Sequence, residues 1–198
     1  MTMAYVFWHT QSKEITQEAY EHDLLAFYDA LAQANCPGVR HSATFRISSL
    51  PWSKEQRGYE DWTIVDGTWA LEDLNTTAVA GPMAAAHSPI ARQMDSGHGG
   101  LYYHLWGELE PHQANRAQWL SRPRGIQFRP VLERIAQSAN TPVSVWRRFM
   151  VLGPGAEFII FGSAPLALQI PTGWQRHAVE RTIVSTGLLG SGQAPVQK

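Results

Sequence analysis

The chain has 198 residues, of which 44% are apolar and 17% charged, so it can bury a sizeable core and is too apolar for intrinsic disorder. Sixteen basic and 17 acidic side chains give a net charge of −1, which provides no broad positive field for nucleic acid or an anionic membrane. No apolar run approaches the roughly 20 residues of a membrane span, and no signal peptide is visible, so a cytoplasmic protein is expected.

The first part of the chain predicts a strand, a long helix, two strands and a broken helix. Thr16 suits the N-cap of the long helix, and Pro37-Gly38 ends it. Two prolines, in Gly81-Pro82 and Ser88-Pro89, divide the later helical stretch into two or three short helices. The predicted strands span residues 4–10, 40–50 and 59–65, and the broken helix spans 69–94.

The rest of the chain predicts a flexible link, a strand, a helix or helix pair, two strands, a short helix and a last strand. These elements span residues 96–100, 101–109, 113–138, 143–152, 157–161, 165–169 and 174–184. The tail, residues 187–198, is rich in Gly, Ser, Gln and Pro and is predicted to be disordered.

Several short patterns occur twice, about a hundred residues apart. Tyr5-Val-Phe-Trp8 resembles Tyr103-His-Leu-Trp106, and Phe45-Arg46 resembles Trp146-Arg147. The repeat predicts two copies of one small α+β unit, residues 1–97 and 98–186. The strand at 101–109 could close the first copy, open the second or belong to both. The aromatic match favours the opening role, in which case the first copy lacks its final strand.

This element order resembles the dimeric α/β-barrel superfamily, in which ferredoxin-like units pair their antiparallel sheets into a barrel. The resemblance covers about residues 4–185 and implies an α+β fold with two tandem units forming an intramolecular barrel, with further homodimerisation possible. Members of this superfamily include cofactor-free oxygenases, isomerases and cyclases acting on aromatic or polyketide-like compounds, haem enzymes, and ligand-sensing modules.

The eight histidines show none of the short spacings of a metal site, and the single cysteine, Cys36, excludes a disulfide and a cysteine-rich site. No metal is therefore predicted. Haem needs only one axial histidine, and His87 or His177 could supply it, but nothing beside either residue is distinctive. The predicted cofactor is none, with haem as the alternative.

Two arginines lie in predicted strands, Arg46 beside Phe45 and Arg147 beside Trp146. An arginine on a buried strand must be paired or face a cleft, because an isolated buried charge is unstable. Pairing with an acid such as Asp61, Glu108 or Glu180 is one interpretation. The other is that these arginines bind a carbonyl or an anionic group of a ligand.

Strand histidines among aromatic residues can act as general bases, although most such residues are hydrogen-bonded core histidines. His9 and His104 are the catalytic candidates. The predicted ligand-binding residues are Arg46, Trp62, Tyr103 and Arg147. Other strand tryptophans either line an aromatic pocket or fill the core.

The predicted function is a small-molecule enzyme that acts without a cofactor on an aromatic or polyketide-like compound, as an oxygenase, isomerase or cyclase. The pocket is expected between the sheet and the helices of one half, with the first half favoured. A haem enzyme and a non-catalytic sensing or assembly module are the alternatives. The P-loop, the nucleophile elbow and the dinucleotide-binding motif are missing from the sequence.

Overall fold

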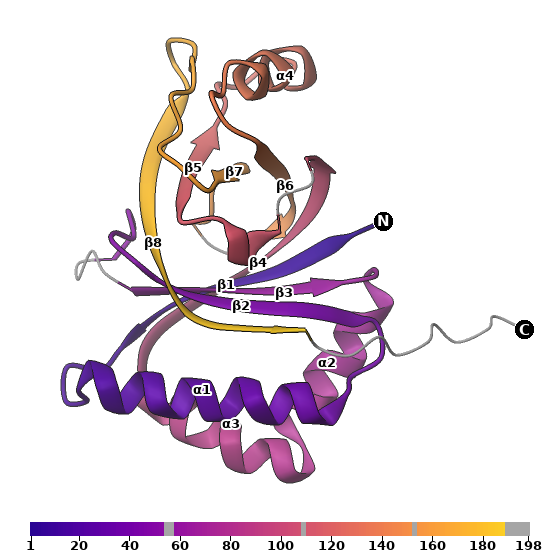
Figure 1. Ribbon diagram of the computed structural model, residues 1–198, viewed down its shortest axis with the longest axis vertical. Helices are drawn as coiled ribbons and strands as arrows, with labels where there is room; N and C mark the ends of the chain where they lie inside the picture. Colours follow the sequence, from indigo (N-terminus) through magenta and orange to yellow (C-terminus); the bar gives the residue numbers. More distant parts are fainter. Residues whose placement is uncertain (54–57, 108–109, 152–153, 189–198) are drawn as a thin grey trace, which may run out of the picture.

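The computed structural model describes residues 1–53, 58–107, 110–151 and 154–188, and it contains helices on both sides of a β-barrel (Figure 1). The elements in chain order are β1 (Met3–Gln11), α1 (Gln17–Ala34), β2 (Val39–Ile47), β3 (Gly58–Val65), α2 (Trp69–Val79), α3 (Gly81–Gln93), β4 (Met94–Trp106), the 3₁₀ turn η1 (Pro111–Gln113), β5 (Arg116–Ser121), α4 (Arg129–Gln137), β6 (Val143–Val151), β7 (Phe158–Gly162) and β8 (Gln175–Leu188).

The strands close into one barrel in the order β1-β3-β2-β8-β5-β7-β6-β4, and every neighbouring pair is antiparallel. Two long strands make the closure possible. β8 pairs with β5 through residues 175–180 and with β2 through residues 181–188, whereas β4 pairs with β1 and, near its end, with β6. The α+β class and the barrel are thus observed as predicted.

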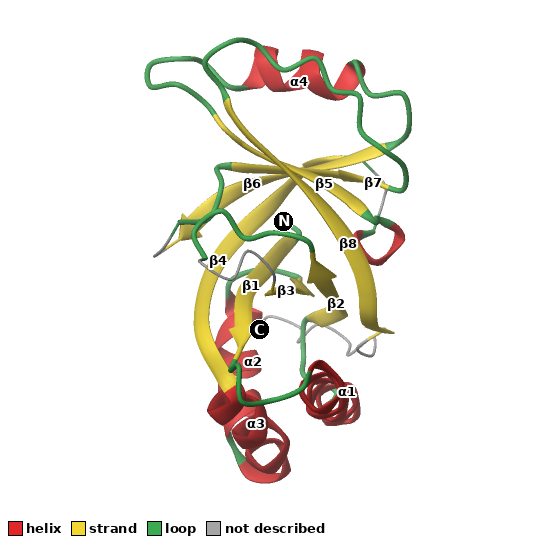
Figure 2. Cartoon of the chain, turned by 90° about the vertical axis from the view of Figure 1, so that its left-hand side faces the viewer, coloured by secondary structure: helices red, strands yellow, loops and turns green. Residues whose placement is uncertain are grey.

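Helices cover the barrel on opposite sides. α1, α2 and α3 lie together against one side, and α4 lies at the other, as the second view also shows (Figure 2). α1 begins as the sequence predicts, because the Thr16 side chain accepts a hydrogen bond from the Ala19 N–H. It ends at Asn35, whose backbone is left-handed with φ 46°.

The barrel interior is filled by side chains, chiefly aromatic ones. Trp8, Trp62, Trp119 and Trp146 are at most 3% exposed and belong to one apolar cluster. Because alternate residues of a strand face opposite sides, these tryptophans point inward while their neighbours face the helices. Two further clusters lie outside the barrel, one beneath α1–α3 and one beneath α4.

One ion pair lies inside this apolar interior. Glu60 on β3 accepts hydrogen bonds from the indole N–H groups of Trp8 at 2.9 Å and Trp62 at 2.6 Å, and it is paired with Arg181 on β8. Both charged side chains are fully buried. Burial lowers the pKa of Arg181, and the Glu60 carboxylate acts in the opposite direction. The pair therefore joins β3 and β8 across the barrel.

Several sequence predictions were wrong. The stretch predicted as helical at 113–138 contains strand β5, since Ala117 and Trp119 face the interior while Leu120 packs beneath α4. The predicted link at 96–100 is part of β4, and 165–169 forms no helix. Only Gly81-Pro82 divides the broken helix, because α3 continues through Pro89.

The predicted boundary between residues 97 and 98 falls inside β4. The similar segments Tyr5–Trp8 and Tyr103–Trp106 lie on strands with different positions in the barrel. β1 lies between β3 and β4, whereas β4 lies between β1 and β6. β8 extends to Leu188, so the predicted tail begins too early; residues 189–198 lie outside the described part of the chain.

We expect Arg181→Met to lower the free energy of unfolding by about 3–5 kcal/mol, because it leaves the buried Glu60 carboxylate without its cation. Urea denaturation measures this loss. The matched control is Arg116→Met, whose partner Glu180 is 70% exposed at 3.4 Å and whose loss should stay within about 1 kcal/mol. Equal losses in both variants would contradict the structural role of the buried pair.

Candidate functional site

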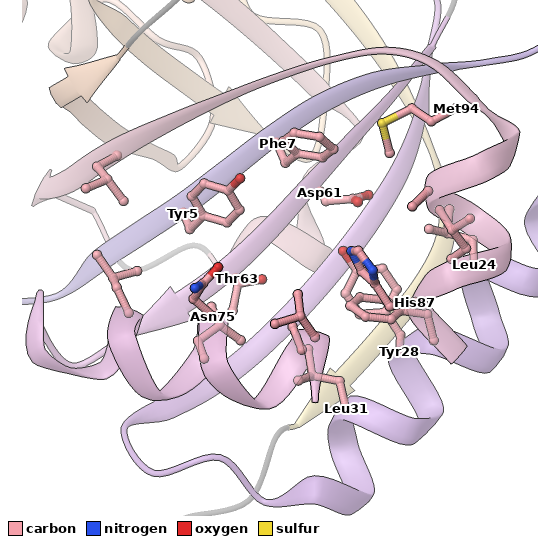
Figure 3. Close-up of a pocket in the computed structure, with 18 residues that line it drawn as sticks. Tyr5, Phe7, Leu24, Tyr28, Leu31, Asp61, Thr63, Asn75, His87 and Met94 are labelled. Atoms are coloured by element: carbon pink, nitrogen blue, oxygen red, sulfur yellow. The ribbon is translucent and has the colours of Figure 1, made fainter. Parts of the chain in front are cut away.

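A cavity of about 600 Å³ lies between the outer face of the sheet and helices α1, α2 and α3 (Figure 3). Its sheet side is formed by β1, β3 and β4, and its helix side is mainly aliphatic and aromatic. This volume lies within the range of about 300–1,000 Å³ that is typical of small-molecule sites. The cavity is therefore large enough for a compound of several fused rings.

Glycines in β4 shape the sheet side of this cavity. A Cβ atom at Gly97 would lie 2.5 Å from Cζ of Phe7, and one at Gly99 would lie 2.8 Å from the Tyr5 hydroxyl. The rings of Tyr5 and Phe7 therefore lie over β4 where these glycines leave room. The two rings are nearly parallel, with an interplanar angle of 21°. They give the cavity a flat aromatic wall.

Asp61 is the acidic group of the cavity. It lies opposite Phe7 in the register of β1 and β3, and its side chain is 10% exposed. Its Oδ2 is 3.0 Å from Nε2 of His9, whereas its Oδ1 is buried without a hydrogen-bond partner. A buried carboxylate oxygen without a partner is unusual, because such a group is costly unless something satisfies it.

His9 links Asp61 to helix α1. Its Nδ1 is 2.6 Å from the hydroxyl of Tyr20, and both residues are at most 1% exposed. Because an ionised carboxylate can only accept, His9 Nε2–H donates to Asp61 and the neutral ring then accepts from the Tyr20 hydroxyl at Nδ1. This arrangement fixes the ring of His9 and leaves Oδ1 of Asp61 as the open acceptor.

Three tyrosines near Asp61 hold their protons strongly. Burial first, and the Asp61 carboxylate second, raise the pKa of Tyr5, Tyr20 and Tyr28 above the ordinary value of a phenol. Tyr5 and Tyr28 line the cavity. Both hydroxyls are therefore hydrogen-bond donors at neutral pH.

The remaining polar side chains of the cavity are Thr63 on β3, Asn75 on α2 and His87 on α3. Thr63 follows Asp61 by two residues on the same face of β3, and Figure 3 labels all four polar residues. None of the residues that the structure places around the cavity is a lysine or an arginine. The site thus has one carboxylate and no permanent cation.

None of the six predicted site residues is among the residues that the structure places around this cavity, but His9 is hydrogen-bonded to Asp61, which lines it. Trp62 is buried in the barrel interior, on the other face of β3. His104 lies against Trp146, with its Nε2 3.2 Å from Oγ of Ser144, and burial lowers its pKa.

Both predicted arginines have partners, and among the described residues these are neither Asp61 nor Glu180. Arg46 donates from Nε to Glu21 on α1 at 3.0 Å. Arg147 donates to the Tyr103 hydroxyl at 2.8 Å, lies 4.0 Å from the centre of the Phe128 ring and is 3.9 Å from Glu157. Glu108, one of the acids considered, lies outside the described residues. Arg46, Tyr103 and Arg147 are not among the cavity residues.

From the sequence, Asp61 was expected only as a possible partner for Arg46 or Arg147. A signal was present: Glu60 and Asp61 are adjacent acids inside a strand whose residues are all buried. Two neighbouring acids in a strand must face opposite sides, so one lies in the barrel and the other beneath the helices.

The described residues contain neither a candidate metal site nor a membrane-spanning helix. No group of three or more His, Cys, Asp or Glu side chains is arranged to hold a metal ion in this part of the chain. In the same part, no helix has the length and hydropathy needed to cross a membrane.

Replacing Gly97 by alanine should shrink the cavity, because the new Cβ displaces the Phe7 ring. We expect N-phenylnaphthylamine, an uncharged fluorescent probe of apolar cavities, to bind about tenfold more weakly. Fluorescence titration measures the affinity. Gly187→Ala is the matched control, since its Cβ would meet only Ser42 at 3.6 Å. Unchanged binding in Gly97→Ala would show that the probe occupies another place.

The comparisons with known proteins concern the fold. No protein-family model matches the sequence, and no curated protein is similar to it in sequence. An anthrone oxidase-like protein of known structure has a TM-score of 0.57 and 13% identity, with 99% of this chain and 97% of that chain covered. A proposed monooxygenase from Lactobacillus acidophilus NCFM has a TM-score of 0.51 and 9% identity, with 96% and 97% covered.

A mutant chlorite dismutase from Candidatus Nitrospira defluvii is more distant, with a TM-score of 0.46, 8% identity and 82% and 77% coverage. At these identities a structural similarity is evidence for the fold and not for an activity. Together with the closed antiparallel barrel, the two stronger similarities show that this chain shares its fold with these two proteins, and the barrel is the fold that the sequence predicted.

Proposed function

We propose that this protein is an enzyme that removes a proton from a flat, fused-ring aromatic or polyketide-like compound and promotes its reaction with dioxygen. The observation that supports this most directly is the open Oδ1 atom of Asp61 in an apolar cavity of about 600 Å³. Because this oxygen has no hydrogen-bond partner, it can accept a proton from a compound that is bound in the cavity.

In this proposal Asp61 is the general base and His9 is a positioning residue. Oδ1 of Asp61 accepts the proton from the substrate, while Nε2–H of His9 holds Oδ2 at 3.0 Å. Tyr20 keeps His9 in the required tautomer through the 2.6 Å contact at Nδ1. The hydroxyl of Tyr5 remains protonated and can donate to the oxygen on which negative charge develops.

Anthrone illustrates the chemistry. Loss of one proton from its methylene carbon gives an aromatic enolate, which can transfer electrons to dioxygen and form a carbon–oxygen bond at that carbon. Protonation gives a hydroperoxide, and loss of the second hydrogen with cleavage of the O–O bond gives anthraquinone and water. Dioxygen is the oxidant; one of its atoms enters the quinone and the other leaves as water.

The fold neighbours are consistent with this class of reaction, since one is described as anthrone oxidase-like and another as a monooxygenase. Isomerase and cyclase reactions on the same kind of substrate also begin with proton removal, so the same base would serve them. A protein that only senses its ligand would use the cavity without turnover.

Anthrone oxidation tests this proposal. We expect the protein to accelerate dioxygen uptake and anthraquinone formation, and Asp61→Asn to reduce the rate about 100-fold or more, because the amide cannot accept the proton. An oxygen electrode and chromatography of the product provide the measurements. Glu133→Gln, the same change at an acid on α4, is the control and should retain the rate. Binding of anthrone without oxygen uptake would instead favour a sensing module.

Haem fits the residues of this cavity poorly. His87 lines it and could be an axial ligand. The described residues around the cavity include no arginine or lysine to pair with the propionates, and the Asp61 carboxylate would repel them. His177, the other histidine considered, is 2.7 Å from Oγ of Ser49 and lies outside this cavity. We derive no step through haem.

Haem titration should therefore give no sharp Soret band that depends on His87. The measurement is a visible-range titration of the protein and of His87→Ala. A stoichiometric Soret band that disappears in His87→Ala would contradict the proposal and restore the haem interpretation.

We further propose that the barrel consists of two ferredoxin-like units in tandem. The barrel order can be divided into β4-β1-β3-β2 and β8-β5-β7-β6, and within each group the chain visits the strands in the same sequence. On this division the first unit ends after Trp106 and not at residue 97. The second unit has the single helix α4, and its segment at 163–174 takes the place of α2 and α3.

A further inference from the structure

We infer that the cavity selects uncharged aromatic ligands that donate a hydrogen bond, and that it rejects carboxylated ones. This inference rests on the proposed site but concerns binding, so it can be tested without turnover. It differs from the prediction made from the sequence, in which Arg46 or Arg147 would hold a carbonyl or anionic group of the ligand.

The charges around the cavity disfavour an anionic ligand. Among the residues that the structure describes around the cavity, Asp61 is the only acid, and there is no lysine or arginine. The contact that partly satisfies Asp61 comes from His9, which lies behind the wall and already donates to Oδ2. A carboxylated ligand would bring a second negative charge close to Asp61 in an apolar space, where repulsion is poorly screened.

Asp61 also favours a ligand that can donate a hydrogen bond. Oδ1 of Asp61 is buried without a partner, and a ligand hydroxyl or N–H group would satisfy it. A hydrogen bond to a charged acceptor is stronger than one between neutral groups. The cavity therefore gains most from a ligand that has a donor at the position facing Asp61.

The shape of the cavity and its second polar position complete the description of the ligand. The rings of Tyr5 and Phe7 form a flat wall that suits a planar ring system. Thr63 on β3 and Asn75 on α2 are further polar residues of the cavity, and the Asn75 amide can donate to a ligand carbonyl (Figure 3). A planar compound with a hydroxyl at one end and a carbonyl at the other fits both positions.

Three naphthalene derivatives substituted at the same ring position test the selection by charge. Naphthol and naphthalene carboxamide are uncharged donors at neutral pH, whereas naphthalene carboxylate has the shape of the carboxamide and a negative charge. Isothermal titration calorimetry gives the three Kd values. We expect the carboxylate to bind at least about tenfold more weakly than the carboxamide to the unmodified protein.

Asp61→Asn should remove this difference, because the variant lacks the charge and its amide can donate to the carboxylate. The expected result is tighter binding of the carboxylate by the variant than by the unmodified protein, which general damage to the fold would not produce. Glu133→Gln is the matched control and should keep the original ratio. The comparison of carboxamide and carboxylate in the unmodified protein remains valid even if Asp61→Asn fails to fold.

Equal binding of carboxylate and carboxamide by the unmodified protein would overturn the inference, as would failure of all three compounds to bind. Selective binding without oxygen uptake on anthrone would leave the inference standing and reject the oxygenase proposal. Oxygen uptake without selectivity would do the reverse.

Discussion

The buried pair of Glu60 and Arg181 is the interaction on which the rest of the structure depends. The two charges lie among aromatic rings, with the Arg181 guanidinium 4.9 Å from the ring centre of Phe45, 5.5 Å from Trp62 and 5.1 Å from Phe161. A buried ion pair is stable only when the two charges are in direct contact and the carboxylate accepts further hydrogen bonds. Glu60 accepts two such bonds, from Trp8 and Trp62. Because Arg181 lies on β8 where its partner strand changes from β5 to β2, the pair holds the two sides of the barrel in one register.

That register also positions the candidate site. Glu60 faces the interior, so Asp61 must face the helices, directly opposite Phe7 on β1. His9, two residues after Phe7, then reaches Asp61 from the same face, and Tyr20 on α1 supports it from above the sheet. The barrel core and the cavity are therefore coupled through two neighbouring residues of β3. The glycines of β4 complete the arrangement by leaving space for the rings of Tyr5 and Phe7.

The sequence predicted the α+β barrel fold and most elements of the first half. Thr16 is a clear N-cap for α1, and the buried strands are rich in apolar residues. It failed at β5, which lies within the stretch predicted as helical at 113–138, although Trp119 points into the barrel. It proposed His9 as a general base and Arg46 and Arg147 as ligand-binding residues, since partners distant in the sequence, such as Glu21 and Phe128, are not visible in a strand pattern. The sequence did not single out Asp61 as a candidate base, because the residues that surround its carboxylate are distant in the sequence.

Hydrogen exchange at the methylene carbon of anthrone tests the central claim most directly, because it isolates proton removal from the later reaction with dioxygen. Anthrone incubated with the protein in heavy water under anaerobic conditions should gain deuterium at that carbon, as measured by proton NMR, faster than in buffer alone. Asp61→Asn should reduce the exchange to the rate in buffer. Exchange that persists in Asp61→Asn, or that never exceeds the rate in buffer, would contradict the assignment of Asp61 as the base of this cavity.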